Sequence, residues 1–322
     1  MTTPRERIAR PARLVALLVV TALVVLAARR LSPARVLTEL ALARPGWILL
    51  ALLCFVCILP LWALQWRLLV PAERRPRVWT MLGVVAMTST VLNTTPLLVG
   101  EAAGVFFLVA EAGLSRVAAV SVLAMDQLFV GLAKLLVLAG AATTVTLPIW
   151  MARGAYALFT AVGLLLAGVV VVAWRADHLS RVLDRLIPPR AARLVVALGA
   201  ALEPIRSTSR SGGALALALA KKVAEMLAIL CVQRAFGVEL HAASALVILA
   251  ATNLATLLPV VPGNLGVYEA AVVLAYSYLG VPPERALGIA VVQHACYFVA
   301  LAVPGYRWLA RGAPARNTAA AA

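Results

Sequence analysis

Long apolar runs, separated by arginine, proline and glycine, follow one another from about residue 12 to residue 309. A membrane-spanning helix needs about 20 such residues, and its backbone satisfies its own hydrogen bonds where lipid offers none. Hydrophobic residues occupy 63% of the 322 positions and charged residues only 13%, which leaves little sequence for a soluble domain. The chain is therefore predicted to be an all-α, polytopic integral membrane protein that forms a single transmembrane domain, 1–322.

About eight full transmembrane helices are predicted from these runs. Two shorter segments, at about 97–113 and about 264–280, lie between the third and fourth and between the seventh and eighth of them. The predicted spans are at about 12–28, 47–66, 79–95, 117–147, 154–174, 213–236, 242–260 and 285–309.

The two short segments carry related motifs, each with a carboxylate inside apolar sequence. Proline and glycine interrupt both segments, so regular helix cannot continue through them, and the freed carbonyls need protein or water around them. We expect a broken helix that lines a cavity. The helix-breaking residues are Pro96 and Gly100 in the first copy, and Pro259, Pro262, Gly263 and Gly266 in the second.

The spacing of the two motifs predicts an internal repeat. Gly113 precedes Asp126 by as many residues as Gly280 precedes Gln293. Paired, broken apolar segments in two halves of a chain are typical of inverted-repeat transporters, which bind substrate between the repeats. We predict an inverted repeat with units at about 47–147 and about 213–309, joined by a connector span at 154–174 and a basic segment at 175–210.

Positive charge is in large excess, with 29 Lys and Arg against 13 Asp and Glu. If the N-terminus is cytoplasmic and both short segments cross, most basic residues face the cytoplasm; if the short segments re-enter and return, the two sides carry similar numbers. The positive-inside rule therefore favours crossing and a cell membrane location. Segment 175–210 is predicted to be an amphipathic helix on anionic headgroups, with a solvated linker as the alternative. No nucleic-acid partner is expected, because no basic folded face lies outside the membrane.

Ionisable groups inside the apolar runs are candidates for function, because each costs a few kcal/mol in a bilayer unless it is paired or hydrated. Glu101 and Glu269 follow helix breaks, so each either caps a helix N-terminus or lines a central cavity, and their duplication favours the cavity. Asp126 and Lys134 pair with other helices or line the cavity, and Glu225 pairs locally with Lys221 or Lys222. The predicted cavity-lining residues are Glu101, Asp126, Glu269, His294, Asn93 and Asn253.

No catalytic or cofactor-binding set is found in the sequence. There is no Ser-His-Asp spacing, HExxH pair, Walker A loop or cluster of metal ligands. The chain is therefore not expected to be an enzyme or to hold a metal or cofactor.

The run from Leu258 to Glu269 has the pattern P-x2-P-G-x2-G-V-x-E and resembles the lysylphosphatidylglycerol synthase transmembrane family. This family is the flippase-like region of bifunctional lipid-aminoacylating proteins and also occurs alone. The first motif matches the family pattern N-x-x-P-x-x-x-G-E-x-x-R up to its final arginine. The resemblance covers about residues 45–310. The soluble aminoacyltransferase domain of the bifunctional members is absent, so a stand-alone member is expected.

Departures from the family pattern lie at three places. Gly104 and His294 stand where arginine is usual, and Asp126-Gln127 replace a common Glu-Arg. In these features the chain is similar to a branch found alongside hopanoid biosynthesis. The loss of the arginines puts in doubt any phosphate contact that relies on them.

The resemblance implies a role in moving membrane lipids. We expect a flippase that translocates polar or polyprenyl-type lipids between the leaflets of the cell membrane. The alternative is a non-transporting scaffold or accessory subunit for an envelope lipid-modifying enzyme, which would then be a protein partner. An intramembrane enzyme is the least favoured of the three hypotheses.

Overall fold

The computed structural model describes residues 32–95, 99–183, 196–257 and 261–312. Every regular element in these ranges is helical, so the predicted all-α fold is confirmed. The predicted first span at 12–28, Pro96 and Pro259 lie outside the described residues.

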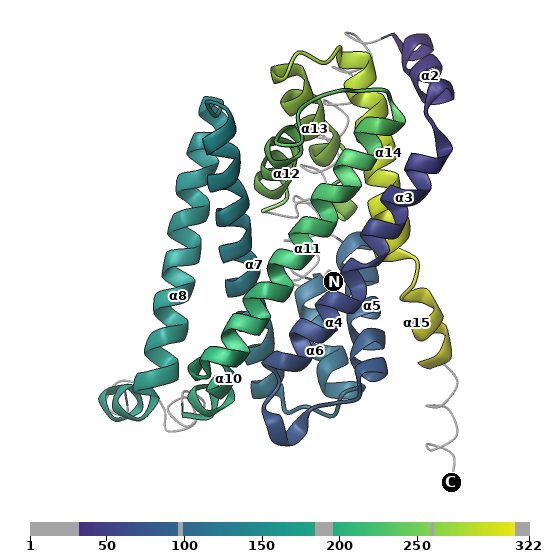
Figure 1. Ribbon diagram of the computed structural model, residues 1–322. Helices are drawn as coiled ribbons and strands as arrows, with labels where there is room; N and C mark the ends of the chain where they lie inside the picture. The colour runs from purple at the N-terminus through teal and green to yellow at the C-terminus, as the bar shows by residue number, and fades with distance from the viewer. Residues whose placement is uncertain (1–31, 96–98, 184–195, 258–260, 313–322) are drawn as a thin grey trace, which may run out of the picture.

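Long helices form the frame of the molecule (Figure 1). They are α3 (Pro45–Val56) continued by α4 (Ile58–Leu69), α7 (Arg116–Thr144), α8 (Ile149–Leu183), α11 (Thr208–Ala235) and α14 (Pro283–Ala302). Four of these passages are long and apolar enough to cross a membrane by length and composition, namely Pro45–Leu69, Arg116–Thr144, Ile149–Trp174 and Pro283–Ala310. Helix α11 has 28 residues, about 42 Å of helix, but carries charged residues along its length.

Short elements join or flank these helices. They are α2 (Pro33–Leu42), the 3-10 helix η1 (Ala72–Arg74), α10 (Glu203–Arg206) and α15 (Tyr306–Gly312).

Two hairpins of shorter helices fill the space between the long ones. The first consists of α5 (Val78–Thr94) and α6 (Val99–Ala110), and the second of α12 (Ser244–Ala255), the 3-10 helix η2 (Pro262–Asn264) and α13 (Val267–Tyr278). Helices α6, α12 and α13 have 12 residues each, about 18 Å, against a hydrocarbon thickness of about 30 Å. Each hairpin turns back toward the end of the bundle at which it begins, α5–α6 in the lower half and α12–α13 in the upper half of Figure 1.

This geometry corrects two expectations. The count of eight full spans is not confirmed, because the predicted spans 79–95 and 242–260 are the first arms of the hairpins. The segments 97–113 and 264–280 do not cross the bundle; they are the second arms and return. The first arms end at Thr94 and Ala255 and the second arms begin at Val99 and Val267, so two apolar runs together make one hairpin.

Packing between the helices is reciprocal across the two halves of the chain. Helices α3 and α4 pack along α11; α7 packs on α12 as α14 packs on α5; and α7 packs on α11 as α14 packs on α3. Equivalent helices run in opposite directions, with α7 rising and α14 descending in Figure 1. An inverted repeat produces this arrangement, although the boundaries given above for its units stay a prediction.

Three arginines, Arg67, Arg75 and Arg210, lie close to one another. The Arg67 Nε donates a hydrogen bond to the Pro76 carbonyl at 3.0 Å, and Arg210 pairs with Glu203 at 2.7 Å. Burial, with Arg210 and Arg67 close by, lowers the pKa of Arg75. The amphipathic helix predicted at 175–210 includes residues 184–195, which lie outside the described ranges, and it stays a prediction.

Candidate functional site

The tip of the second hairpin touches the end of α5. Gly263 has φ +60°, and a Cβ added there would lie 2.8 Å from the Asn93 carbonyl oxygen. Gly266, at φ +81°, precedes α13. A residue with a side chain would meet strain at both glycines and a steric overlap at Gly263. The glycines of the second motif therefore let the two hairpins approach each other.

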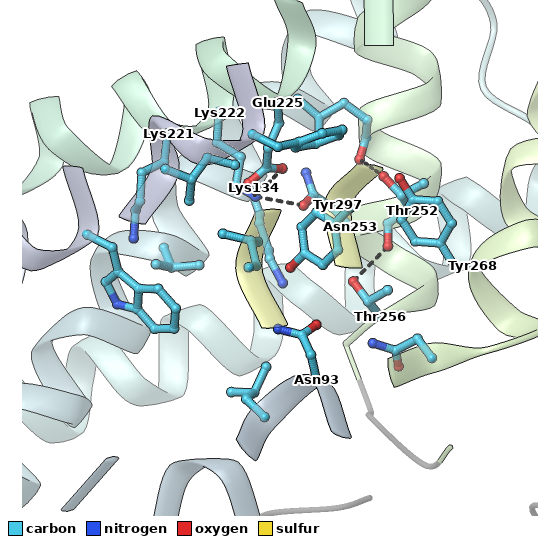
Figure 2. A pocket seen from close by; sticks show the side chains of 18 of the residues that line it. Asn93, Lys134, Lys221, Lys222, Glu225, Thr252, Asn253, Thr256, Tyr268 and Tyr297 are labelled. Carbon is cyan, nitrogen blue, oxygen red and sulfur yellow. Dashed lines mark hydrogen bonds and ion pairs between the residues drawn. The ribbon is translucent and has the colours of Figure 1, made fainter. Parts of the chain in front are cut away.

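A cavity of about 240 Å³ opens beside these tips (Figure 2). It is smaller than the roughly 300–1,000 Å³ of pockets that enclose drug-sized ligands, so it has room for a polar headgroup and not for a whole lipid. Side chains from α3, α4, α5, α6, α7, α11, α12, η2, α13 and α14 line it.

Charged side chains on α7 and α11 form one side of the cavity, which we call the lysine wall: Asp126, Lys134, Lys221, Lys222 and Glu225. The Lys222 Nζ lies 2.8 Å from both carboxylate oxygens of Glu225 and 3.0 Å from the Asn253 Oδ1. The Lys221 Nζ lies 3.8 Å from the Asp126 Oδ1 and 5.4 Å from the centre of the Trp62 ring. Figure 2 shows the three lysines around the same hollow.

Aromatic rings also line the cavity, and we call this set the aromatic wall: Phe55, Trp62, Tyr268, His294 and Tyr297. Phe55 and Tyr297 pack edge to face with ring centres 5.5 Å apart. Tyr268 stacks on His294 at 4.3 Å and accepts a hydrogen bond from Gln293. These rings come from α3–α4, α13 and α14, so the two walls belong to different pairs of long helices.

Two charged residues at the cavity form no ion pair among the described residues. Lys134 has no carboxylate within 4.0 Å among the described residues. Glu101, in the first turn of α6, likewise has no ion pair in the described part of the chain, and its Oε2 is buried without a hydrogen-bond partner there.

The predicted site residues are distributed as follows. Asn93, Glu101, Asp126, Asn253 and His294 border the cavity, as does Gly263. Within the described residues, Glu269 is not part of the lining. Its Oε2 accepts a hydrogen bond from the Gly266 backbone at 2.7 Å and its Oε1 lies 2.7 Å from the His294 Nδ1. Glu269 is thus a helix cap that holds His294, the alternative to the predicted cavity role.

The other helix-breaking residues act through the backbone. Pro262 opens η2. A Cβ on Gly100 would lie 2.6 Å from the Leu92 Cα, so Gly100 lets α6 lie against α5. A Cβ on Gly104 would already meet Thr88 and Trp66 at 3.2 and 3.3 Å. The Trp66 side chain occupies the space that an arginine at position 104 would need.

Sequence reasoning gave cavity lining as one of two alternatives for Lys134 and left Lys221 and Lys222 out of the predicted lining. It placed Lys221 and Lys222 beside Glu225, and the local pair of Lys222 with Glu225 is present. It missed that α11 turns both lysines toward the cavity. The internal repeat could have indicated this. The shift in residue number that aligns Asp126 with Gln293 also aligns Phe55, Ile58 and Trp62 with Lys222, Glu225 and Ile229. All of these residues line the cavity.

No group of three or more His, Cys, Asp or Glu side chains in the described ranges is arranged to hold a metal ion. The lining offers charges, amides and aromatic rings. Such a set offers charge, hydrogen bonds and ring faces to a polar group.

Fold and site together define a multi-pass α-helical membrane protein with a charged cavity beside two opposed re-entrant hairpins. Residues 13–305 match the family described as the lysylphosphatidylglycerol synthase TM region. The chain belongs to this family, as the motif around Glu269 indicated. Searches of curated proteins and of solved structures find no match.

Proposed function

We propose that this protein translocates polar or polyprenyl-type lipids between the leaflets of the cell membrane. The observation that carries the proposal is the charged cavity beside the tips of two hairpins that enter the bundle from opposite ends. Buried charges in a membrane protein mark substrate or ion pathways.

The size and walls of the cavity support a headgroup path. Its volume of about 240 Å³ accommodates a headgroup, while acyl or prenyl chains would stay in the surrounding bilayer. Opposed hairpins in an inverted arrangement also provide two alternative closures, one toward each leaflet, as alternating access requires.

Charge fixes the proposed orientation. The basic cluster of Arg67, Arg75 and Arg210 lies beside α10, whose Glu203 pairs with Arg210, and α10 is at the lower end of the bundle in Figure 1. The positive-inside rule assigns this end to the cytoplasm, and a cytoplasmic N-terminus is part of the same proposal. We further propose that transport involves no covalent chemistry, so that the protein is a transporter and not an enzyme.

A leaflet-sidedness assay in proteoliposomes tests the proposal. Fluorescent lipids in the inner leaflet become accessible to a membrane-impermeant quencher only if the protein moves them outward. We expect the wild-type chain to move at least one polar or polyprenyl lipid, and Glu101→Gln to slow this movement about tenfold or more. Glu111→Gln is the matched control, because Glu111 is an exposed residue at the end of the first hairpin. Failure of every lipid class tested to move would overturn the proposal.

A scaffold for an envelope lipid-modifying enzyme is the second candidate. The basic end of the bundle favours it, since clustered arginines also bind acidic protein surfaces. Under this hypothesis Glu101→Gln combined with Glu269→Gln leaves the cellular lipid phenotype intact, whereas replacing the arginines of 175–210 abolishes it. The opposite result excludes the scaffold.

A further inference from the structure

We infer that the Glu269–His294 pair binds a proton and that this proton is coupled to movement of the second hairpin, so that a proton gradient drives the lipid movement. The inference rests on the proposed function, because it names the ion that supplies energy for that function. His294 is the one histidine among the described residues that borders the cavity.

The pair joins α14 to the tip of the second hairpin. Glu269 uses its two oxygens in two directions: Oε2 accepts a hydrogen bond from the Gly266 backbone at 2.7 Å, and Oε1 lies 2.7 Å from the His294 Nδ1. Gly266 directly precedes α13, and Gly263, three residues earlier, lies against the Asn93 carbonyl of α5. A change of charge on His294 therefore acts on the carboxylate that holds the hairpin tip.

The imidazole of His294 has one nitrogen left for a proton. A carboxylate only accepts hydrogen bonds, so Nδ1 carries the hydrogen of the neutral ring and Nε2 keeps a lone pair. No described residue forms a hydrogen bond with Nε2, and the ring borders the cavity. A hydronium ion in the cavity gives its proton to this lone pair and leaves a water molecule. Imidazole ordinarily exchanges a proton between about pH 5 and pH 8, which allows loading and unloading near neutral pH.

The immediate surroundings of the ring suit an imidazolium ion. Tyr268 stacks on the ring with centres 4.3 Å apart, and an aromatic face attracts a cation. Glu269 is the one carboxylate within 4.0 Å of His294 in the described part of the chain. The proton converts a hydrogen bond between a neutral ring and a carboxylate into an ion pair. It therefore tightens the contact through which Glu269 holds the hairpin.

The other charged groups near the pair balance one another. Helix α14 packs on α2, α3, α5, α11 and α13. The charged residues from α2 and α11 are already paired, Glu39 with Arg285 and Glu225 with Lys222. Helices α3 and α5 bring no charged side chain to the cavity, and the neighbouring titratable groups on α13 and α14 are tyrosines. The described lining holds three cations and three carboxylates: Lys134, Lys221, Lys222, Glu101, Asp126 and Glu225.

Coupling to the hairpin follows from the reciprocity of linked binding equilibria. If the proton strengthens the hold of Glu269 on the hairpin, a hairpin movement that draws Glu269 away from His294 weakens proton binding by the same factor. One closure of the cavity then takes up the proton and the other releases it. Opposed hairpins supply the two closures that such a cycle needs.

The first experiment follows proton binding directly, in the full chain with isotope-labelled histidine. The chain has three histidines, and NMR spectra of His294→Gln and His241→Gln assign their signals. We expect the His294 signal to titrate between about pH 5 and pH 8. At the pH where half of the wild-type His294 is protonated, Glu269→Gln should lower the protonated fraction about fivefold, because the opposite charge is lost.

The second experiment measures lipid movement in proteoliposomes with a gradient of about one pH unit and at equal pH on both sides, at each of the two pH values. The gradient is applied in both directions, so the orientation of the chain does not matter. Wild type should move lipid about fivefold faster with the gradient than at either equal pH. The readout for each variant is this ratio, so a change in the rate without a gradient does not affect the comparison.

Substitutions at His294 separate proton exchange from a structural role. His294→Gln keeps a donor toward Glu269 and His294→Arg keeps a positive charge, but neither exchanges a proton near neutral pH. Both should bring the ratio close to one. His241→Gln is the matched control, because His241 is an exposed histidine between α11 and α12, and it should keep the wild-type ratio.

Three results would overturn the inference. They are a His294 signal that stays constant over the whole titration, wild-type lipid movement that does not respond to the gradient, and a gradient response that persists in His294→Gln. The first needs no variant, so it holds even if the substituted chains do not fold. The second leaves the proposed transport standing without its proton coupling. If no lipid moves under any condition, the proposed transport itself is wrong and the coupling fails with it.

Discussion

The two halves of the molecule place equivalent residues around one cavity but give them different chemistry. A single shift in residue number relates α7 to α14 and also α3–α4 to α11. The lining residues Asp126, Gln127, Val130 and Lys134 correspond to Gln293, His294, Tyr297 and Leu301, and Phe55, Ile58 and Trp62 correspond to Lys222, Glu225 and Ile229.

Packing explains how this difference produces one charged wall and one aromatic wall. Helix α7 of the first half packs on α11 of the second, and both contribute charges; α14 packs on α3, and both contribute rings. The polar substitutions therefore collect on one side of the cavity although they come from both halves. Reciprocal packing of the backbone thus places charges on one pair of packed helices, α7 and α11, and rings on another, α3 and α14.

The largest expected effect comes from breaking the buried pair of the lysine wall. Asp126→Asn or Lys221→Met alone leaves a buried charge without its partner and should lower the free energy of unfolding by about 3–5 kcal/mol. The double variant should recover most of this loss. Denaturant unfolding in micelles measures the coupling between the two residues.

Gln293, which corresponds to Asp126 in the other half, supplies the control. Gln293→Leu removes a neutral hydrogen bond to Tyr268 and should cost about 1 kcal/mol. Equal losses at Asp126 and Gln293 would contradict the distinction between the two walls.

Glycines at the hairpins give the next largest effect. Gly263→Ala adds a methyl group 2.8 Å from the Asn93 carbonyl at a residue with positive φ, which should cost roughly 2–4 kcal/mol. Gly113→Ala and Gly280→Ala occupy equivalent places with positive φ and open space around the new Cβ, so each should cost about 1–2 kcal/mol.

Melting temperatures of the three alanine variants test this ranking. The backbone is equivalent in the two halves at Gly113 and Gly280, whereas Gly263 belongs to the contact between the hairpins. If Gly263→Ala were no worse than Gly280→Ala, the two hairpins would not be in close contact.

Sequence patterns predicted the helical class and the places where helices break, because hydropathy and Gly/Pro chemistry are local. They did not reveal that 79–95 and 97–113 form one hairpin. The positive-inside rule depends only on the side of the membrane on which each loop lies. Two full crossings bring the chain back to the side from which it started, and so does one hairpin of two arms. Charge counting therefore placed the loops consistently with the structure and still misjudged what lies between them.

Only part of the candidate site was predicted, because the sequence shows local chemistry but not the contacts between distant helices. Glu101 and Asp126 border the cavity, and their apolar neighbours in the sequence made them conspicuous. Lys221 and Lys222 have a nearby acidic residue, Glu225, which made a local ion pair a sufficient account of all three. Only the tertiary contact between α7 and α11 brings Lys221 to Asp126.

The smallest predicted effect, that of Glu101→Gln, separates the two motif carboxylates. Glu269 accepts a hydrogen bond from the Gly266 backbone and lies beside the His294 Nδ1, so Glu269→Gln should lower the free energy of unfolding by about 1–3 kcal/mol. Glu101 has a buried oxygen without a partner in the described residues, so Glu101→Gln should change the stability by less than about 0.5 kcal/mol or increase it.

The same substitution at corresponding places in the two halves thus tests whether the copies have diverged in role. We expect Glu269→Gln to lower the melting temperature and, where protein remains folded, to leave lipid movement close to normal. Glu101→Gln should show the reverse, with an intact melting temperature and slowed movement. A matched loss of stability in both variants would mean that both glutamates are helix caps. In that case the first half would contribute Asp126 and Lys134 to the cavity but no motif carboxylate, and the functional difference proposed for the two motifs would be wrong.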